Sequence, residues 1–180
     1  MLNKIYIIDF EDSFTFNIAS EIYSYETDLE VIPHHVFFSE VSFNDFMKKT
    51  DRRIAVILGP GPGSPARYEN YFDKIRQLKK VQFIYLMGIC LGHQIISLID
   101  GFVIRPSIVP KHGIQIKIHL FDQDLLVQRY NSLAVFSSYS DSNEILIRKW
   151  EKGISYQFHP ESVGSEKRAL FFRELLNFIS

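Results

Sequence analysis

Apolar and polar positions divide the chain into short apolar runs and longer stretches with helical spacing. The runs IYII, IAVIL and FIYLM contain almost no polar residue. Such runs are typical of strands buried on both faces, as in a parallel sheet covered by helices. We expect strands at Lys4–Asp9, Leu29–Ile32, Arg53–Leu58, Gln82–Met87, Leu133–Ser137, Ile145–Trp150 and Gly153–Phe158.

One further strand has a different pattern. In IQIKIHL, residues Ile114–Leu120, apolar and polar residues alternate, which indicates a half-exposed antiparallel strand. Helical spacing predicts helices at Ser13–Tyr25, Phe43–Lys49, Tyr68–Lys79, Leu91–Ile99 and Ser165–Ile179. Ser165 is the expected N-cap of the last helix.

This order of elements predicts an α/β fold with an open, mostly parallel sheet flanked by helices. A smaller antiparallel portion is expected after residue 100. The length of 180 residues suits one domain spanning residues 1–180. Open sheets of this kind bind ligands at the C-terminal ends of their parallel strands, so candidate chemistry is sought there.

Composition and charge argue against several classes of partner and site. The net charge is −1, from 20 basic and 21 acidic residues, and gives no electrostatic case for a nucleic acid or an anionic membrane as partner. No apolar run approaches the ~18 residues of a membrane span, and the N-terminus does not resemble a signal peptide. We therefore expect a cytoplasmic protein. The single cysteine, Cys90, excludes an internal disulfide and a multi-cysteine metal site.

The first candidate segment for chemistry is GPGPGSP, residues 59–65, which follows the strand IAVIL. Alternating Gly and Pro can continue neither a strand nor an ordinary helix. The segment Gly61-Pro62-Gly63 can present backbone N–H groups to a developing negative charge. The alternative is a tight connection without chemistry, and the segment alone does not decide between the two.

The second segment, GICLGHQ at residues 88–94, follows the strand FIYLM and precedes a predicted helix. Its G-x-C-x-G form is that of a nucleophile elbow with sulfur in place of a serine oxygen. The helix N-terminus places partial positive charge beside the sulfur of Cys90, which favours the thiolate. The alternative is a buried structural cysteine. The strand–turn–helix context favours the nucleophile.

The third segment, QFHPES at residues 157–162, places a histidine at a strand end and an acid two residues later. Glu161 can hold the imidazole of His159 in one tautomer while His159 exchanges protons with Cys90. Nucleophile, base, orienting acid and oxyanion donors together indicate acyl transfer through a thioester.

These motifs resemble those of class I, triad-type glutamine amidotransferases. The resemblance is narrower for the small subunits (component II) of anthranilate synthase and aminodeoxychorismate synthase. It rests on IIDFEDSFTFN, LGPGPGSP, GICLGHQ, QFHPES and the segment RYNSL at residues 129–133. The matching segments occur in the expected order and lie between residue 5 and residue 163.

The resemblance implies a role for each matching residue. Cys90 would attack the side-chain amide of glutamine, and His159, oriented by Glu161, would protonate the departing ammonia and then activate water. Backbone N–H groups near Gly63 and Leu91 would hold the oxyanion. The remaining implied glutamine contacts are Gln94, Ser132 and Leu133.

The resemblance also implies a heteromer. A chorismate-binding synthase subunit would receive the ammonia, in tryptophan or folate biosynthesis, without a cofactor in this chain. The subgroup usually has Asn-Tyr at Phe10-Glu11, Ser at Gly59 and His at Asn131, and it has a longer segment around Leu120–Arg129. None of these differences removes a member of the triad.

Two other functions remain open from the sequence. The chain could be a catalytically impaired subunit that only binds its partner, or a gamma-glutamyl hydrolase on the same scaffold. A metal site is not expected. His93 is assigned a structural role, and the pair His34-His35 is too sparse for a metal without nearby acids. Asp9 and Asp12 are expected to bond to backbone N–H groups.

Overall fold

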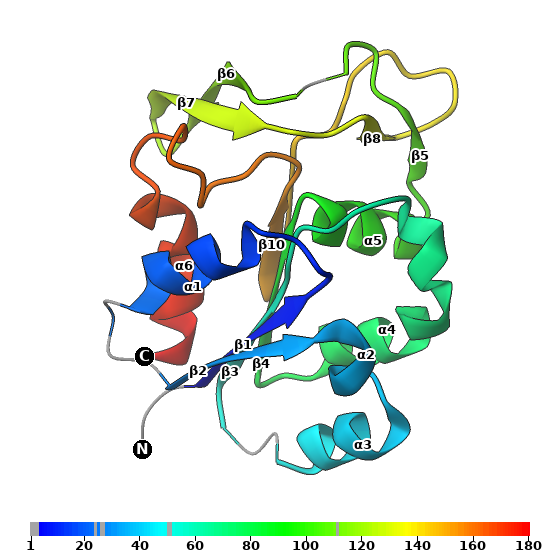
Figure 1. The fold of residues 1–180 in the computed structure, drawn as a ribbon, viewed down its shortest axis with the longest axis vertical. Helices are drawn as coiled ribbons and strands as arrows, with labels where there is room; N and C mark the ends of the chain where they lie inside the picture. The colour runs from blue at the N-terminus through cyan, green and yellow to red at the C-terminus, as the bar shows by residue number, and fades with distance from the viewer. Residues whose placement is uncertain (1–3, 24, 26–27, 50–51, 111) are drawn as a thin grey trace.

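The computed structural model describes residues 4–23, 25, 28–49, 52–110 and 112–180 (Figure 1). Its centre is a six-stranded sheet with the order β2-β1-β3-β4-β10-β9. The first five strands in this order are parallel, and the edge strand β9 is antiparallel to β10. The strands are β1 (Lys4–Asp9), β2 (Asp28–Pro33), β3 (Ile54–Leu58), β4 (Ile84–Ile89), β9 (Ile147–Trp150) and β10 (Gly153–Tyr156).

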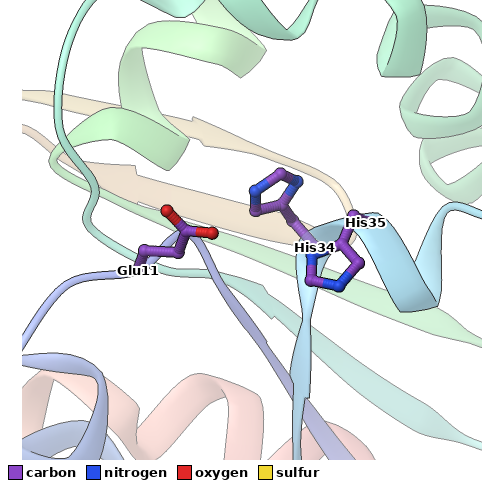
Figure 2. A group of neighbouring side chains, drawn as sticks. All are labelled: Glu11, His34 and His35. Carbon is purple, nitrogen blue, oxygen red and sulfur yellow. The ribbon is translucent and has the colours of Figure 1, made fainter.

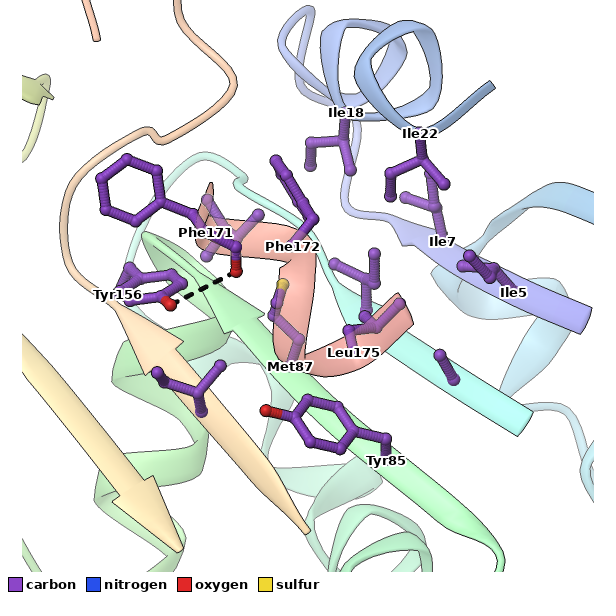
Figure 3. Close-up of a cluster of buried hydrophobic side chains, with 14 of the residues drawn as sticks. Ile5, Ile7, Ile18, Ile22, Tyr85, Met87, Tyr156, Phe171, Phe172 and Leu175 are labelled. Carbon is purple, nitrogen blue, oxygen red and sulfur yellow. Dashed lines mark hydrogen bonds between the residues drawn. The ribbon is translucent and has the colours of Figure 1, made fainter. Parts of the chain in front are cut away.

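Helices cover both faces of this sheet (Figure 1). On one face lie α1 (Thr15–Tyr23), which packs on Ile5 and Ile7 of β1, and α6 (Ala169–Ile179), which packs on β3 and β4 (Figure 3). On the other face lie α2 (His34–Phe37), α3 (Glu40–Lys48), the 3-10 helix η1 (Pro65–Tyr71), α4 (Phe72–Lys80) and α5 (Leu91–Ile99). Because successive side chains of a strand point to opposite faces, β1 contributes to both hydrophobic clusters.

Two small antiparallel sheets complete the fold above the main sheet. One pairs β5 (Val103–Pro106) with β8 (Leu133–Phe136), and the other is a hairpin of β6 (Ile114–Leu120) and β7 (Gln123–Arg129). Phe121 and Asp122 form its two-residue turn, both with positive φ of 56° and 58°. Such a turn matches the twist of the two strands and keeps the hairpin short.

The predicted fold class is confirmed: the sheet is mostly parallel, helices flank it, and the antiparallel portion follows residue 100. The alternating segment is a half-exposed antiparallel strand as expected. The sequence did not reveal β5, β7 or α2. In addition, β4 continues two residues beyond the expected end at Met87, and β10 stops two residues before the expected end at Phe158.

Several predicted helix boundaries were wrong. The helix expected at Tyr68–Lys79 is instead divided between η1 and α4, with α4 starting only at Phe72. Tyr68 itself has non-helical geometry inside η1, with φ −110° and ψ 18°. The expected helix at Phe43–Lys49 begins earlier, at Glu40, where the Ser39 side chain accepts a hydrogen bond from the amide of Ser42.

The last helix also differs from the expectation. Ser165 does not cap it, since α6 begins at Ala169. The Ser165 hydroxyl instead accepts a hydrogen bond from the Gln128 amide and donates one to the carbonyl of His159. The prediction of α1 included Ser24, which lies outside the described residues. Within the described residues, no helix has the length and apolar character needed to cross a membrane.

Candidate active site

Cys90 lies in the sharp turn between β4 and α5, with φ 51° and ψ −99°. A positive φ at a non-glycine residue costs about 1–3 kcal/mol, and the surrounding structure must hold it in place. The amide of Cys90 donates to the carbonyl of Tyr156 at 2.8 Å. A Cβ atom added at Gly92 would lie 2.1 Å from the carbonyl oxygen of Leu58, and one at Gly88 would lie 2.8 Å from Gly92 backbone atoms. The turn therefore needs both glycines, as expected of a nucleophile elbow.

His159 and Glu161 form a buried pair beside this turn. The imidazole Nδ1 lies 2.8 Å from Glu161 Oε1, and both residues are 2% exposed. The rings of Phe14 and Tyr130 pack on the imidazole with centroid distances of 4.9 and 5.1 Å. Within the described part of the chain, Nε2 has no hydrogen-bond partner. Nε2 is therefore the nitrogen left for proton exchange with Cys90.

Burial and charge act on the pKa of His159 in opposite directions. Burial lowers this pKa, whereas the negative charge of Cys90 and the hydrogen-bonded Glu161 carboxylate raise it. The charges outweigh burial, so the pKa of His159 lies well above its usual value of 6.5. The negative neighbours of His159 therefore favour the protonated imidazole when Cys90 carries its charge.

A cavity of about 250 Å³ opens above Cys90. It is lined by Asp12, Gly61, Pro62, Gly63, Cys90, Gln94, Tyr130, Asn131, Ser132 and Leu133. All the residues expected to bind glutamine are in this set except Leu91, whose buried side chain packs under Gly61. A larger, more open hollow of about 710 Å³ near the start of α6 is lined by none of the predicted site residues.

A network of amide groups fixes one wall of the cavity. The side-chain amides of Gln94 and Asn131 both donate to the carbonyl of Leu133 at 2.8 Å. Arg129 Nε donates to Asn131 Oδ1 at 2.9 Å, and the same guanidinium forms an ion pair with Glu144 at 2.6 Å. Asn131, which departs from the subgroup's usual histidine, is thus fixed in the framework that shapes the cavity.

Two contacts with the reacting groups were not predicted from the sequence. Gln157 Nε2 donates to Cys90 Sγ at 3.9 Å, and Gln157 Oε1 accepts from Gln94 at 3.3 Å. Phe14 was considered only as part of a helix start, yet its ring packs against His159. Both residues lie inside the quoted motifs, which was the available signal for them.

Two structural assignments from the sequence are confirmed. Asp9 Oδ1 accepts from the amides of Glu11 and Asp12, and Asp12 Oδ1 accepts from the amide of Phe14. His93 is fully buried, with its ring nitrogens 2.8 Å from Ser155 Oγ and 2.9 Å from the carbonyl oxygen of Ile145. Burial lowers the pKa of His93 to about 3, so its ring is neutral near pH 7.

The sequence indicated that His34 and His35 are too sparse for a metal without nearby acids, and the structure places one acid, Glu11, beside them. Glu11 follows β1, whereas the histidines follow the neighbouring parallel strand β2, so the sheet brings them to one edge. Figure 2 shows the Glu11 carboxylate pointing toward the His34 ring. Separation along the sequence concealed this proximity.

Known proteins resemble the chain along most of its length. The family model described as Glutamine amidotransferase class-I matches residues 6–144. A Schizosaccharomyces pombe protein with the provisional name aminodeoxychorismate synthase is 33% identical, over 97% of this chain and 26% of its own length. Anthranilate synthase component 2 of Saccharolobus solfataricus is 32% identical, over 97% of this chain and 96% of its own length.

A solved structure supports the fold. It is that of a Thermoplasma acidophilum protein, provisionally named as part of a GMP synthase, with a TM-score of 0.78 at 15% identity, covering 99% of this chain and 94% of that one. The chain spans 26–32% of the length of the first four curated relatives it matches. The family match and the relative of similar length establish that this chain belongs to the class I glutamine amidotransferase family.

Proposed function

We propose that this chain hydrolyses glutamine through a glutamyl thioester on Cys90 and supplies the ammonia to a chorismate-aminating synthase subunit. The observation that carries the proposal is the strained Cys90 turn beside the buried His159–Glu161 pair, at the floor of a cavity of about 250 Å³. The partner class is inferred from the names of relatives, which are anthranilate synthase component 2 and aminodeoxychorismate synthase.

In the proposed reaction, Cys90 Sγ attacks the side-chain carbonyl of glutamine. Backbone N–H groups of Gly63 and Leu91 stabilise the oxyanion of the tetrahedral intermediate. His159 gives its proton to the departing ammonia, and the glutamyl thioester remains on Cys90. His159 then takes a proton from water, which attacks the thioester and releases glutamate. Glu161 fixes the tautomer of His159 throughout.

The cavity wall sets the proposed binding mode. The backbone of Ser132 and Leu133, fixed by Gln94 and Asn131, contacts the amino-acid end of glutamine. Gly61, Pro62 and Gly63 enclose the side-chain amide from the opposite wall. No separate observation favours a gamma-glutamyl hydrolase or a catalytically impaired subunit.

Glutamate release from glutamine tests the proposal, measured with chorismate in the presence and absence of a co-expressed chorismate-binding partner. We expect release to rise with the partner, to vanish in Cys90→Ser, and to fall by roughly three orders of magnitude or more in His159→Ala. The Cys90→Ser complex should still aminate chorismate with free ammonia, which controls for folding and assembly. A complex that forms but never releases glutamate would indicate an impaired chain that only binds its partner. A preference for glutamyl peptides over glutamine would indicate the hydrolase.

A further inference from the structure

Three side chains with metal-binding atoms meet at the edge of the sheet beside the active site. The ligand atoms of Glu11, His34 and His35 all lie within 4.8 Å of one another (Figure 2). Glu11 and His35 are exposed, and His34 is half-buried. The parallel register pairs Asp9 with Pro33, so the residues that follow β1 and β2 emerge side by side.

His34 is held in a fixed orientation by its surroundings. Its ring stacks on Phe10 with a centroid distance of 5.2 Å and an interplanar angle of 8°, and it meets the Tyr68 ring edge-on at 5.3 Å. Its Nδ1 lies 3.3 Å from the Tyr71 hydroxyl. In the tautomer whose Nδ1–H donates to this hydroxyl, Nε2 keeps its lone pair for a metal ion, which is the usual arrangement of a metal-binding histidine and its outer partner.

The other two side chains are free to move toward an ion. In the described part of the chain, neither the Glu11 carboxylate nor the His35 imidazole has a hydrogen-bond or ion-pair partner. The backbone of Glu11 is nevertheless fixed, with φ 66° and its amide bonded to Asp9 Oδ1 at 3.0 Å. Neighbouring ligand atoms of a tetrahedral zinc ion lie about 3.3 Å apart. The ligand atoms of Glu11, His34 and His35 now lie within 4.8 Å of one another. Rotation of the exposed Glu11 and His35 side chains can bring these atoms to the shorter separation.

We propose that Glu11, His34 and His35 bind a divalent transition-metal ion of the Zn²⁺ type. Two imidazoles and one carboxylate favour such ions over Mg²⁺ and Ca²⁺, which prefer oxygen ligands. Three protein ligands leave a fourth position for water or another ligand. None of the three residues lines the cavity above Cys90, so the metal site is distinct from the proposed glutamine site.

Calorimetric titration of chelator-treated protein with Zn²⁺ tests the site. Cys90→Ser serves as the parent protein, because the thiol and His159 could themselves take up Zn²⁺. We expect the parent to bind about one equivalent of Zn²⁺ saturably. Glu11→Gln and His35→Ala should each weaken the affinity roughly 10-fold or more, as for loss of a metal ligand or its support. Circular dichroism checks that each variant is folded.

His119→Ala is the matched control. His119 is an exposed histidine that is 3.0 Å from one carboxylate, Asp124, and no third His, Cys, Asp or Glu joins this pair in the described chain. Its loss should leave the Zn²⁺ affinity within about twofold of the parent. Equal affinity in the parent and in the doubly substituted Glu11→Gln/His35→Ala protein would overturn the proposal, as would a parent that binds no Zn²⁺ saturably.

Discussion

At the scale of single residues, burial and neighbouring negative charges act on the pKa of His159 in opposite directions, and the charges prevail. Its burial alone would keep the imidazole neutral, as burial does for His93. The two histidines are comparably enclosed, and their pKa values move in opposite directions because only His159 faces negative partners. The structure thus separates a titrating histidine from a structural one through their neighbours.

Removing the negative charge of Cys90 should therefore lower the pKa of His159. In Cys90→Ser, the imidazole has only Glu161 to offset burial, so we expect it to lose its proton at a lower pH than in the wild type. An NMR titration of the His159 ring protons measures this directly. His93 is the internal control and should not titrate between about pH 5 and 9. Superimposable His159 titrations in the two proteins would contradict the assignment.

The same raised pKa affects stability in a defined direction. A folded-state pKa above the unfolded value contributes stability that is complete below about pH 6.5 and is lost as the pH rises through the folded value. The difference in unfolding free energy between wild type and Cys90→Ser should therefore diminish as the pH rises above about 6.5.

At the scale of elements, the junction of β3, β4 and α5 determines where Cys90 points. Gly92 donates its amide to the carbonyl of Gly59 at 3.2 Å, which ties the start of α5 to the end of β3. This close approach also connects the GPGPGSP segment to the nucleophile turn. Any side chain at Gly92 would separate the two elements, because the obstructing atoms belong to the backbone.

Gly92→Ala should therefore destabilise the protein, although alanine is the better helix former by about 1 kcal/mol. The added Cβ would lie 2.1 Å from the Leu58 oxygen, and overpacking of this kind typically costs about 1–3 kcal/mol or more. Urea denaturation measures the loss. Asn44→Ala, at an exposed position of α3, isolates the helix-propensity contribution and should be neutral or slightly stabilising. A Gly92→Ala protein as stable as the wild type would show that β3 and α5 can move apart.

Elements with a strong local pattern could be predicted from the sequence, and those defined by distant partners could not. The strands β1, β3 and β4 were predictable because burial on both faces leaves a near-continuous apolar run. The helix α5 was predictable because its apolar residues recur at helical spacing. β7 was missed because Gln128 and Arg129 are polar, and only pairing with β6, a bridge to His159 and the Glu144 ion pair make their burial favourable.

In the candidate active site, too, residues within local motifs were predictable, whereas contacts between distant side chains were not. The GPGPGSP, GICLGHQ and QFHPES motifs predicted which residues would gather around Cys90, since each lies at the end of a strand of one parallel sheet. The RYNSL segment follows β7 of a separate hairpin. The contacts of Gln157 with Cys90 and of Phe14 with His159 depend on side-chain placement across the fold. So does the approach of Glu11 to the histidine pair. Local periodicity contains no information about such contacts.

At the scale of the whole molecule, two hydrophobic clusters lie on opposite faces of one sheet. Ile18 of α1 belongs to one cluster and Ile75 of α4 to the other, and both are fully buried. The central strands contribute side chains to both clusters, so weakened packing in either cluster should destabilise the same sheet. We therefore propose that the described chain unfolds as one cooperative domain.

Paired substitutions test this cooperativity. Ile18→Val and Ile75→Val should each lower the free energy of unfolding by about 0.5–1.5 kcal/mol. Because the two residues belong to different hydrophobic clusters, the double variant should lose the sum within about 0.5 kcal/mol. Fluorescence and far-UV circular dichroism should report one coincident transition in all three proteins. Separate transitions for the two faces would contradict a single cooperative unit.

Cys90 is the single cysteine among the 180 residues, and this has a consequence for oxidative damage. Mild oxidants convert a thiolate to a sulfenic acid, which a second cysteine commonly captures as a disulfide that reductases can reverse. The 180 residues contain no second cysteine. Cys90 is 9% exposed at the floor of its cavity, so a thiol that reduces the oxidised sulfur must be small enough to enter that space. Without such a thiol, continued exposure drives the sulfur to irreversible sulfinic and sulfonic acids.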